Sequence, residues 1–130
     1  MVPITKRVTG WINVTSIEST PYDEAAGGSI AEVRVVEEFT GDLLGTGTVR
    51  FQMLTLDDGS GSFVGLERFV GQIGERHGTF VFRNAGTLEG GQVRAEWAVI
   101  PGSGTGELAG LRGLGGANGD TGVFLDYWFE

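Results

Sequence analysis

The stretch GTVRFQMLTLDDGSGSFVGLERFVGQI, residues 47–73, decides the fold class, because it reads as two strands joined by a tight turn. In its first half the apolar residues Val49, Phe51 and Met53 alternate with polar ones, which is the period of a strand with one buried face. Residues 57–61 form a turn, with glycines where a positive φ is needed. Residues 62–73 then run back as a second strand. The pattern therefore predicts an antiparallel hairpin.

The same alternation continues on both sides of this hairpin. Residues 29–39 place Ala31, Val33, Val35 and Phe39 on one face and charged side chains on the other. Further strands are predicted at residues 6–17, 79–88, 92–100 and 122–130, with turns in GERHG and EGG. Strands with such short connections are typical of a sandwich or a closed barrel. Helical character is confined to single turns, in DEAAGG and GELAGL.

Glycine decides between these two architectures. The chain has 24 glycines in 130 residues. The glycines inside predicted strands are Gly10, Gly45, Gly47, Gly65 and Gly86. They favour a closed barrel, which needs sharp strand bends at such positions. Since no linker or change of composition divides the chain, we predict one all-β domain over residues 1–130, folded as an antiparallel β-barrel of about seven or eight strands.

Charge and composition exclude several classes of protein. The net charge of -8 disfavours nucleic-acid and membrane partners, whose anionic surfaces are bound through Lys and Arg. The absence of cysteine excludes disulfides and thiolate ligands, and the single histidine makes a catalytic zinc improbable. No apolar run has the length of a signal peptide or of a membrane span. We therefore expect a cytoplasmic protein without a metal or cofactor.

The glycine-rich segment PGSGTGELAGLRGLGG, residues 101–116, has two interpretations. A dinucleotide-binding fingerprint needs a helix directly after the glycines, and a phosphate loop needs a lysine. Neither follows here. The favoured interpretation is a tight turn followed by a strand that packs closely on its neighbours.

Four segments resemble the signature segments of an uncharacterised bacterial family: PYDEAAGG, FTGDLLGTGTV, SFVGLERFVGQIG and PGSGTGELAGLRGLGG. The resemblance covers nearly the whole chain. That family is related in fold to allene oxide cyclases and dirigent proteins, so the resemblance implies an eight-stranded, calycin-like barrel. It places residues 101–116 at the last corner of the barrel and in the strand that leaves it.

The resemblance also implies a class of function. Allene oxide cyclases and dirigent proteins use a cofactor-free barrel cavity to shape a reactive apolar substrate. Two departures limit the transfer. Where the cyclases carry a glutamate and an asparagine, this chain has Ile12 and Val14, so allene oxide chemistry itself is not implied. Where family members often carry a histidine, it has Asn84, so a histidine mechanism is not implied either.

Two glutamates are the candidate catalytic residues. Glu67 shares a strand face with Phe63, Gly65 and Phe69, and we expect this face to point inward, with Gly65 leaving space for the carboxyl group. A carboxyl enclosed there has a raised pKa and suits general acid or base work. Glu37 lies on an apolar face as well and could divide acid and base roles with Glu67. The alternative is a structural ion pair with a neighbouring arginine.

The candidate ligand-binding residues are one amide and several aromatic side chains on predicted inner faces: Phe51, Phe63, Phe82, Asn84, Trp97 and Tyr127. Asn84 could hydrogen-bond a ligand carbonyl, and the rings could wall a cavity or simply fill the core.

The expected function is a cofactor-free barrel that encloses an apolar small molecule, as a cyclase, isomerase or dehydratase of bacterial secondary metabolism. The alternatives are a non-catalytic ligand-binding barrel and a structural homo-oligomer whose barrel is filled with side chains. In an oligomer, the outward residues Val64, Leu66 and Val70 would be covered.

Overall fold

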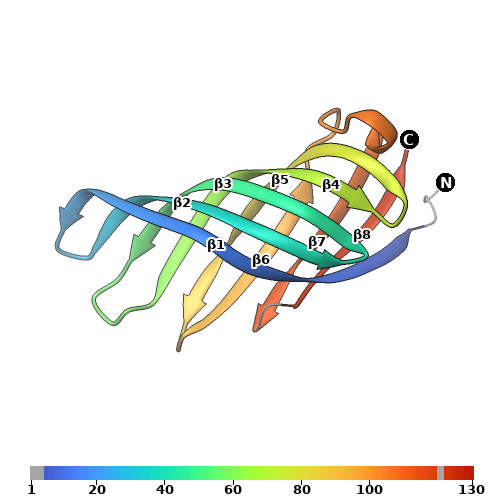
Figure 1. Ribbon diagram of the computed structural model, residues 1–130. Coiled ribbons are helices and arrows are strands. Elements are labelled where there is room, and N and C mark those ends of the chain that lie inside the picture. The colour runs from blue at the N-terminus through green and yellow to red at the C-terminus, as the bar shows by residue number, and fades with distance from the viewer. Residues whose placement is uncertain (1–4, 120–121) are drawn as a thin grey trace.

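The computed structural model describes residues 5–119 and 122–130, which form strands and one short 3₁₀ helix (Figure 1). In chain order the elements are β1 (Lys6–Ala25), β2 (Gly28–Gly41), β3 (Leu43–Thr55), β4 (Gly61–Ile73), β5 (Arg76–Glu89), β6 (Gln92–Val99), η1 (Gly106–Leu108), β7 (Leu111–Gly119) and β8 (Gly122–Phe129). The prediction of an all-β chain of eight strands is confirmed.

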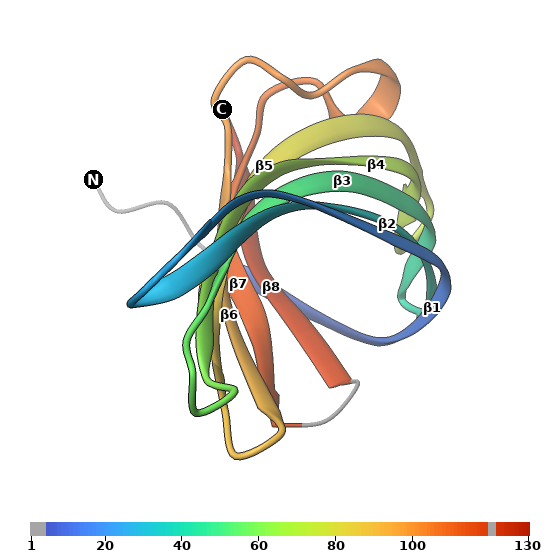
Figure 2. The same ribbon diagram turned by 90° about the vertical axis from the view of Figure 1, so that its left-hand side faces the viewer.

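The eight strands form one antiparallel sheet that closes into a ring. Each strand pairs with the next in the chain, and β8 pairs back with β1. Figure 2 shows β1–β5 curving round one side of the ring and β6–β8 standing on the other. Arg7 on β1 donates two hydrogen bonds to Asp126 on β8, at 2.7 and 2.8 Å, on the outer surface of the closing pair.

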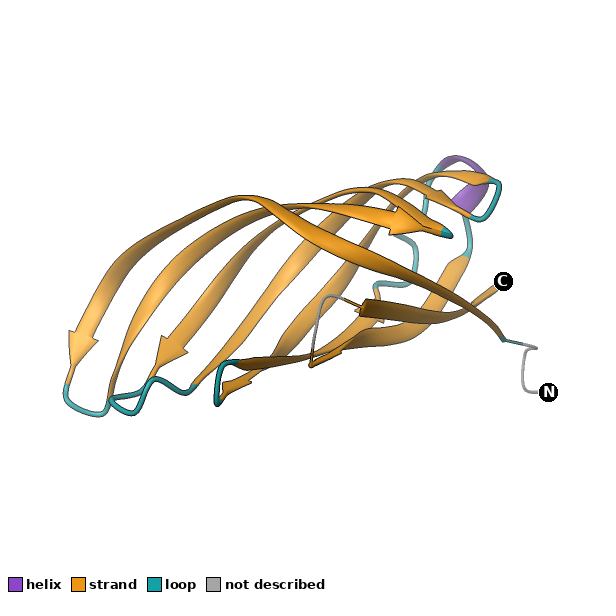
Figure 3. Ribbon diagram, turned by 60° about the horizontal axis from the view of Figure 1, so that its bottom comes forward, coloured by secondary structure: helices purple, strands orange, loops and turns teal. Residues whose placement is uncertain are grey.

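Closure of the ring is limited to one end of the sheet. β1 pairs with β8 only from Lys6 to Trp11, although it pairs with β2 as far as Ala25. The first five strands have 13 to 20 residues, whereas β6, β7 and β8 have 8 or 9. The longer strands therefore extend beyond the shorter ones (Figure 3), which leaves part of their inner face without an opposite wall.

The main core fills the closed end of the ring. Its aromatic members are Phe39, Phe69, Phe80, Phe82 and Trp97. Leu108 of η1 is fully buried in the same cluster, so this short helix covers that end. Figure 1 shows η1 at the end of the molecule remote from the β1–β2 turn. A smaller cluster of Val33, Val35 and Val49 lies nearer the open end.

Two local predictions were wrong and one was confirmed. β1 ends at Ala25 rather than near residue 17, because its pairing with β2 continues through a stretch that has no apolar alternation of its own. In DEAAGG, the end of β1 and the start of β2 flank a two-residue turn at residues 26–27, with Gly27 at φ 94°, and there is no helical turn. GELAGL does contain a helical turn, η1.

The glycine-rich segment has a structural role, as predicted. Gly102, Gly106 and Gly110 adopt φ values of 86°, 60° and 82°, which favour glycine, in the turn around η1. In β7 a Cβ on Gly115 or Gly116 would collide with a carbonyl oxygen of the adjacent strand. The glycines thus let β7 pack closely between β6 and β8. Within the described part of the chain, no helix is long and apolar enough to cross a membrane.

Candidate functional site

Glu67 lies on the inner face of β4 and is fully buried, with 0% of its surface exposed. Its cross-strand neighbours, Val49 and Phe82, are buried core residues. The predicted inward direction of Glu67 is therefore confirmed. A charged group in such surroundings is unstable unless it is paired or protonated.

The space for this carboxyl group comes from Gly47 and not from Gly65, which corrects the prediction. A Cβ on Gly47 would collide with Oε2 of Glu67 and would lie 2.8 Å from Cε1 of Phe39. A Cβ on Gly65 would instead meet the backbone carbonyl oxygen of Arg50 at 2.6 Å and then side chains of β3. Gly47 thus leaves a recess that the Glu67 carboxyl and the Phe39 ring both border.

Three strands bring polar groups to this recess. Asn84 on β5 donates a hydrogen bond from Nδ2 to Oε1 of Glu67 at 3.0 Å, and Asn84 is itself buried. Glu37 on β2 pairs with Gly47 and is 6% exposed, and its carboxyl is within hydrogen-bonding range of Glu67. The structure thus brings together Glu37, Glu67 and Asn84, three of the predicted site residues. We call them the carboxyl cluster.

The carboxyl cluster holds a proton at neutral pH. The pKa of Glu67 is raised to about 10, chiefly by burial and then by the hydrogen bond and charge repulsion with the adjacent Glu37, while the hydrogen bond from Asn84 lowers it. Burial also raises the pKa of Glu37, while its hydrogen bond with Glu67 lowers it. Glu67 is therefore the neutral acid of the pair at pH 7, and its proton is shared with Glu37.

Several buried polar atoms at the site have no hydrogen-bond partner among the described residues. They are Oε2 of Glu67, Oδ1 of Asn84 and Nε1 of Trp97. The proton that Glu67 shares with Glu37 satisfies the first of these, but the other two stay unpaired. Buried polar groups are nearly always hydrogen-bonded, so each exception calls for an explanation.

Trp97 joins the carboxyl cluster to the aromatic core. It lies on β6 directly opposite Asn84 and is 4% exposed. Its ring centroid is 4.7 Å from that of Phe82 and 5.9 Å from that of Phe39. Trp97 and Phe82 are thus core residues that also border the candidate site. Tyr127 is half-buried beside Phe129, and none of its described contacts reaches the carboxyl cluster.

The open end of the ring exposes apolar side chains on the inner face. Directly opposed residues of an antiparallel pair share a face, so Val14 lies on the same face as Glu37, and Ile17 on the same face as Val35. These two inward side chains are 49% and 66% exposed. Phe51 and Phe63, two predicted ligand-binding residues, are half-buried nearby with ring centroids 4.9 Å apart. We call Val14, Ile17, Phe51 and Phe63 the open end.

Sequence reasoning missed Gly47 and the two β1 residues for different reasons. From the sequence, Gly47 could be interpreted only as a bend in its strand, because its pairing with the buried Glu37 on the adjacent strand was unknown. A bulge between Val14 and Ser16 shifts the alternation of β1 and turns Ile17 inward. The period-2 pattern is interrupted there, so the sequence gives no clear signal for that face.

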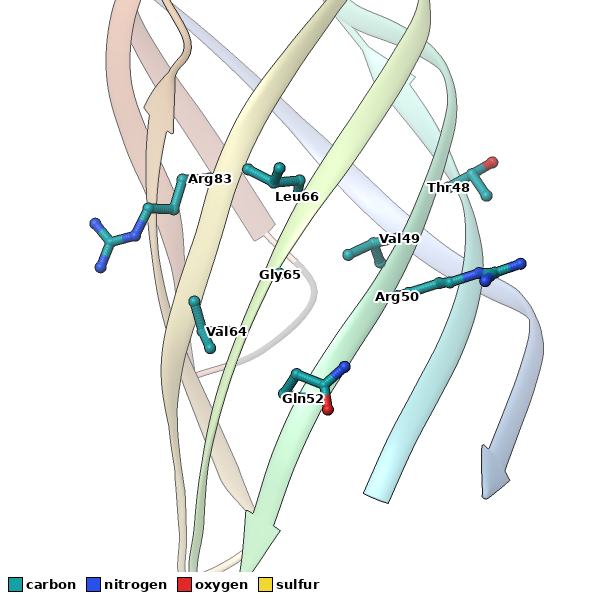
Figure 4. Close-up of a pocket in the computed structure, with 8 residues that line it drawn as sticks. All are labelled: Thr48, Val49, Arg50, Gln52, Val64, Gly65, Leu66 and Arg83. Carbon is teal, nitrogen blue, oxygen red and sulfur yellow. The ribbon is translucent and has the colours of Figure 1, made fainter. Parts of the chain in front are cut away.

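A hollow lies on the outer face of β3–β5 (Figure 4). It has a volume of about 590 Å³ and lies around Gly65, Val64 and Leu66, with Arg50 and Arg83 pointing away on either side. It is a shallow depression in a sheet surface and contains no buried polar group. The outward residues Val64, Leu66 and Val70 are 45%, 60% and 52% exposed. Among the described residues, no group of three or more His, Cys, Asp or Glu could hold a metal ion.

Fold and site together define an all-β protein with a closed eight-stranded sheet and a buried carboxyl cluster. The chain belongs to the DUF3224 family, a family of unknown function whose model matches residues 8–130. It is also similar to a crystal structure of a DUF3224 protein of unknown function from Shewanella oneidensis MR-1. The two share 28% sequence identity over 98% of each chain, with a TM-score of 0.78. No curated protein matches the sequence. Neither finding names an allene oxide cyclase, so that relationship stays a prediction.

Proposed function

We propose that the protein binds a small, largely apolar molecule inside the closed sheet, which enters at the open end and reaches toward the carboxyl cluster. One observation carries this proposal: buried polar atoms of Asn84 and Trp97 have no hydrogen-bond partner, and the inward apolar side chains of the open end are exposed. An apolar site with a few convergent polar groups is the usual form of a small-molecule pocket.

The chemistry that this site would support is acid–base catalysis without a cofactor. Glu67 offers a proton, and the adjacent Glu37 carboxyl group is placed to accept one, the two roles that a cyclase, isomerase or dehydratase needs. Relationship to the allene oxide cyclase barrels would fit this class. Non-catalytic binding uses the same site, and only a turnover assay with a bound ligand distinguishes the two. The absence of cysteine suits the reducing cytoplasm, where we place the protein.

A filled, structural ring is the competing interpretation, and a specific observation favours it. Phe39, Phe69, Phe80 and Phe82 pack with Trp97 into a continuous core with ring centroids 4.7 to 5.9 Å apart. In that case the outward apolar residues of β4 would be buried in a homo-oligomer. The core occupies the end of the ring near η1, whereas the open end retains exposed inward side chains. For this reason we favour ligand binding.

The test is a fluorescence titration with the neutral apolar probe N-phenyl-1-naphthylamine. We expect saturable binding to the wild type. Phe63→Ala, at the open end, should weaken it by about tenfold or more, since a buried aromatic side chain contributes about 1.5–3 kcal/mol. Val64→Ala is the matched control, because Val64 is the next residue on the same strand and points outward. Absence of saturable binding, or equal loss in both variants, would overturn the proposal.

A further inference from the structure

The carboxyl cluster has more hydrogen-bond acceptors than donors. Oδ1 of Asn84 receives no hydrogen bond from a described group, while Nδ2 of the same side chain donates to Oε1 of Glu67. The single shared proton serves one of the carboxyl oxygens. With that proton on Oε2 of Glu67, the unpaired buried atoms are one acceptor, Oδ1 of Asn84, and one donor, Nε1 of Trp97. A ligand that reaches the carboxyl groups and this amide oxygen must donate hydrogen bonds to them.

The charge of the interior has one sign. Glu37 and Glu67 are the buried charged residues of the described chain, and each described lysine or arginine is exposed or half-exposed. No described cation therefore neutralises the pair from within. An anionic ligand would meet carboxyl groups and no positive charge, which strongly disfavours it.

Aromatic rings complete the surroundings. Phe39 and Glu67 both border the Gly47 recess, and Phe39 and Phe82 both pack against Trp97. In these apolar surroundings, the unpaired amide oxygen and the carboxyl groups without a cation suit the same ligand group, an ammonium, which has three donors and no acceptor.

We infer that the ligand is a hydrophobic primary amine, bound as its ammonium form between Glu37, Glu67 and the free amide oxygen of Asn84. This inference rests on the binding function proposed above. A primary amine is already protonated in neutral solution, with a pKa near that of lysine, about 10.4. On binding, the O–H bond of Glu67 breaks, its proton passes to water, and the ammonium N–H groups take its place as donors. About one proton is released for each ligand bound.

Three probes of the same shape and different charge test this inference: 3-phenylpropylamine, 3-phenylpropan-1-ol and 3-phenylpropionate. Isothermal titration calorimetry at pH 7 in buffers of different ionisation enthalpy gives both the affinity and the number of protons released. We expect the amine to bind at least tenfold more tightly than the alcohol, and the carboxylate to bind most weakly. Proton release should be close to one for the amine and zero for the alcohol.

The double variant Glu37→Gln/Glu67→Gln should lose the preference for the amine and the proton release, but still bind the alcohol. Glu96→Gln, at an exposed position on β6, should behave as the wild type. If the wild type binds the alcohol as tightly as the amine, or binds the amine without releasing a proton, the inference is overturned while the binding function stands. If neither the three probes nor the naphthylamine binds, the proposed function itself fails.

Discussion

Replacing Glu67 by glutamine should make the protein more stable at neutral pH. The folded chain keeps the Glu67 carboxyl neutral, with its pKa raised to about 10, whereas in the unfolded chain the group returns to its ordinary value of 4.5. Between these two values the folded state holds a proton that the unfolded state has lost. The free energy of unfolding therefore falls as the pH rises above 4.5. Glutamine is a neutral group of the same shape and avoids this penalty.

The size of the effect follows from the difference in pKa. From 4.5 to pH 7 the penalty grows by about 1.4 kcal/mol per pH unit, so it reaches about 3 kcal/mol at pH 7. In Glu67→Gln the side-chain carbonyl can still accept the hydrogen bond from Asn84, and the amide can donate to Glu37. The variant should match the wild type near pH 4 and exceed it by up to about 3 kcal/mol at pH 7.

Urea unfolding of both proteins at pH 4, 5, 6 and 7 measures this difference. Glu96→Gln, which removes an exposed carboxyl group, is the control and should differ from the wild type by no more than about 0.5 kcal/mol at any pH. A Glu67→Gln variant that is less stable than the wild type at pH 7 would refute the reasoning. So would a difference that stays the same from pH 4 to pH 7, because it would show that Glu67 does not bind its proton more tightly in the folded state.

Two further predictions concern packing around the carboxyl cluster. Gly47→Ala should lower the free energy of unfolding by about 1–3 kcal/mol in urea titrations, since the new methyl group meets the Glu67 carboxyl and the Phe39 ring. In the background of Glu67→Ala the same change should be less costly. If the effects of the two substitutions on the free energy of unfolding simply add, the proposed recess is contradicted. Phe39→Leu should lower the free energy of unfolding by about 1–3 kcal/mol in the same assay, because it removes the edge-on contacts with Phe69 and Trp97, whose ring centroids are 5.3 and 5.9 Å away. An effect below about 0.5 kcal/mol would show that these aromatic contacts do not stabilise the closed sheet.

Much of the candidate site could be predicted from single strands. Alternation along β4 and β2 is enough to place Glu67 and Glu37 among apolar side chains, because the side chains of a strand point to alternate faces. The same rule places Trp97 and Phe82 inward. It cannot show that Glu37 and Glu67 share a proton, since they lie on β2 and β4 and meet only across the space left by Gly47 on β3.

The sequence by itself determined the fold class of this protein, since period-2 alternation and glycine turns are local properties that each strand carries on its own. It also determined which face of most strands is buried. Only the tertiary structure decided where the ring is closed and where it is open, because this depends on the registers of β1 with β2 and with β8. The bulge after Val14 turns Ile17 inward, and the short pairing with β8 leaves that face exposed. Strand register depends on contacts between residues far apart in the chain, and those contacts place the carboxyl cluster behind the open end.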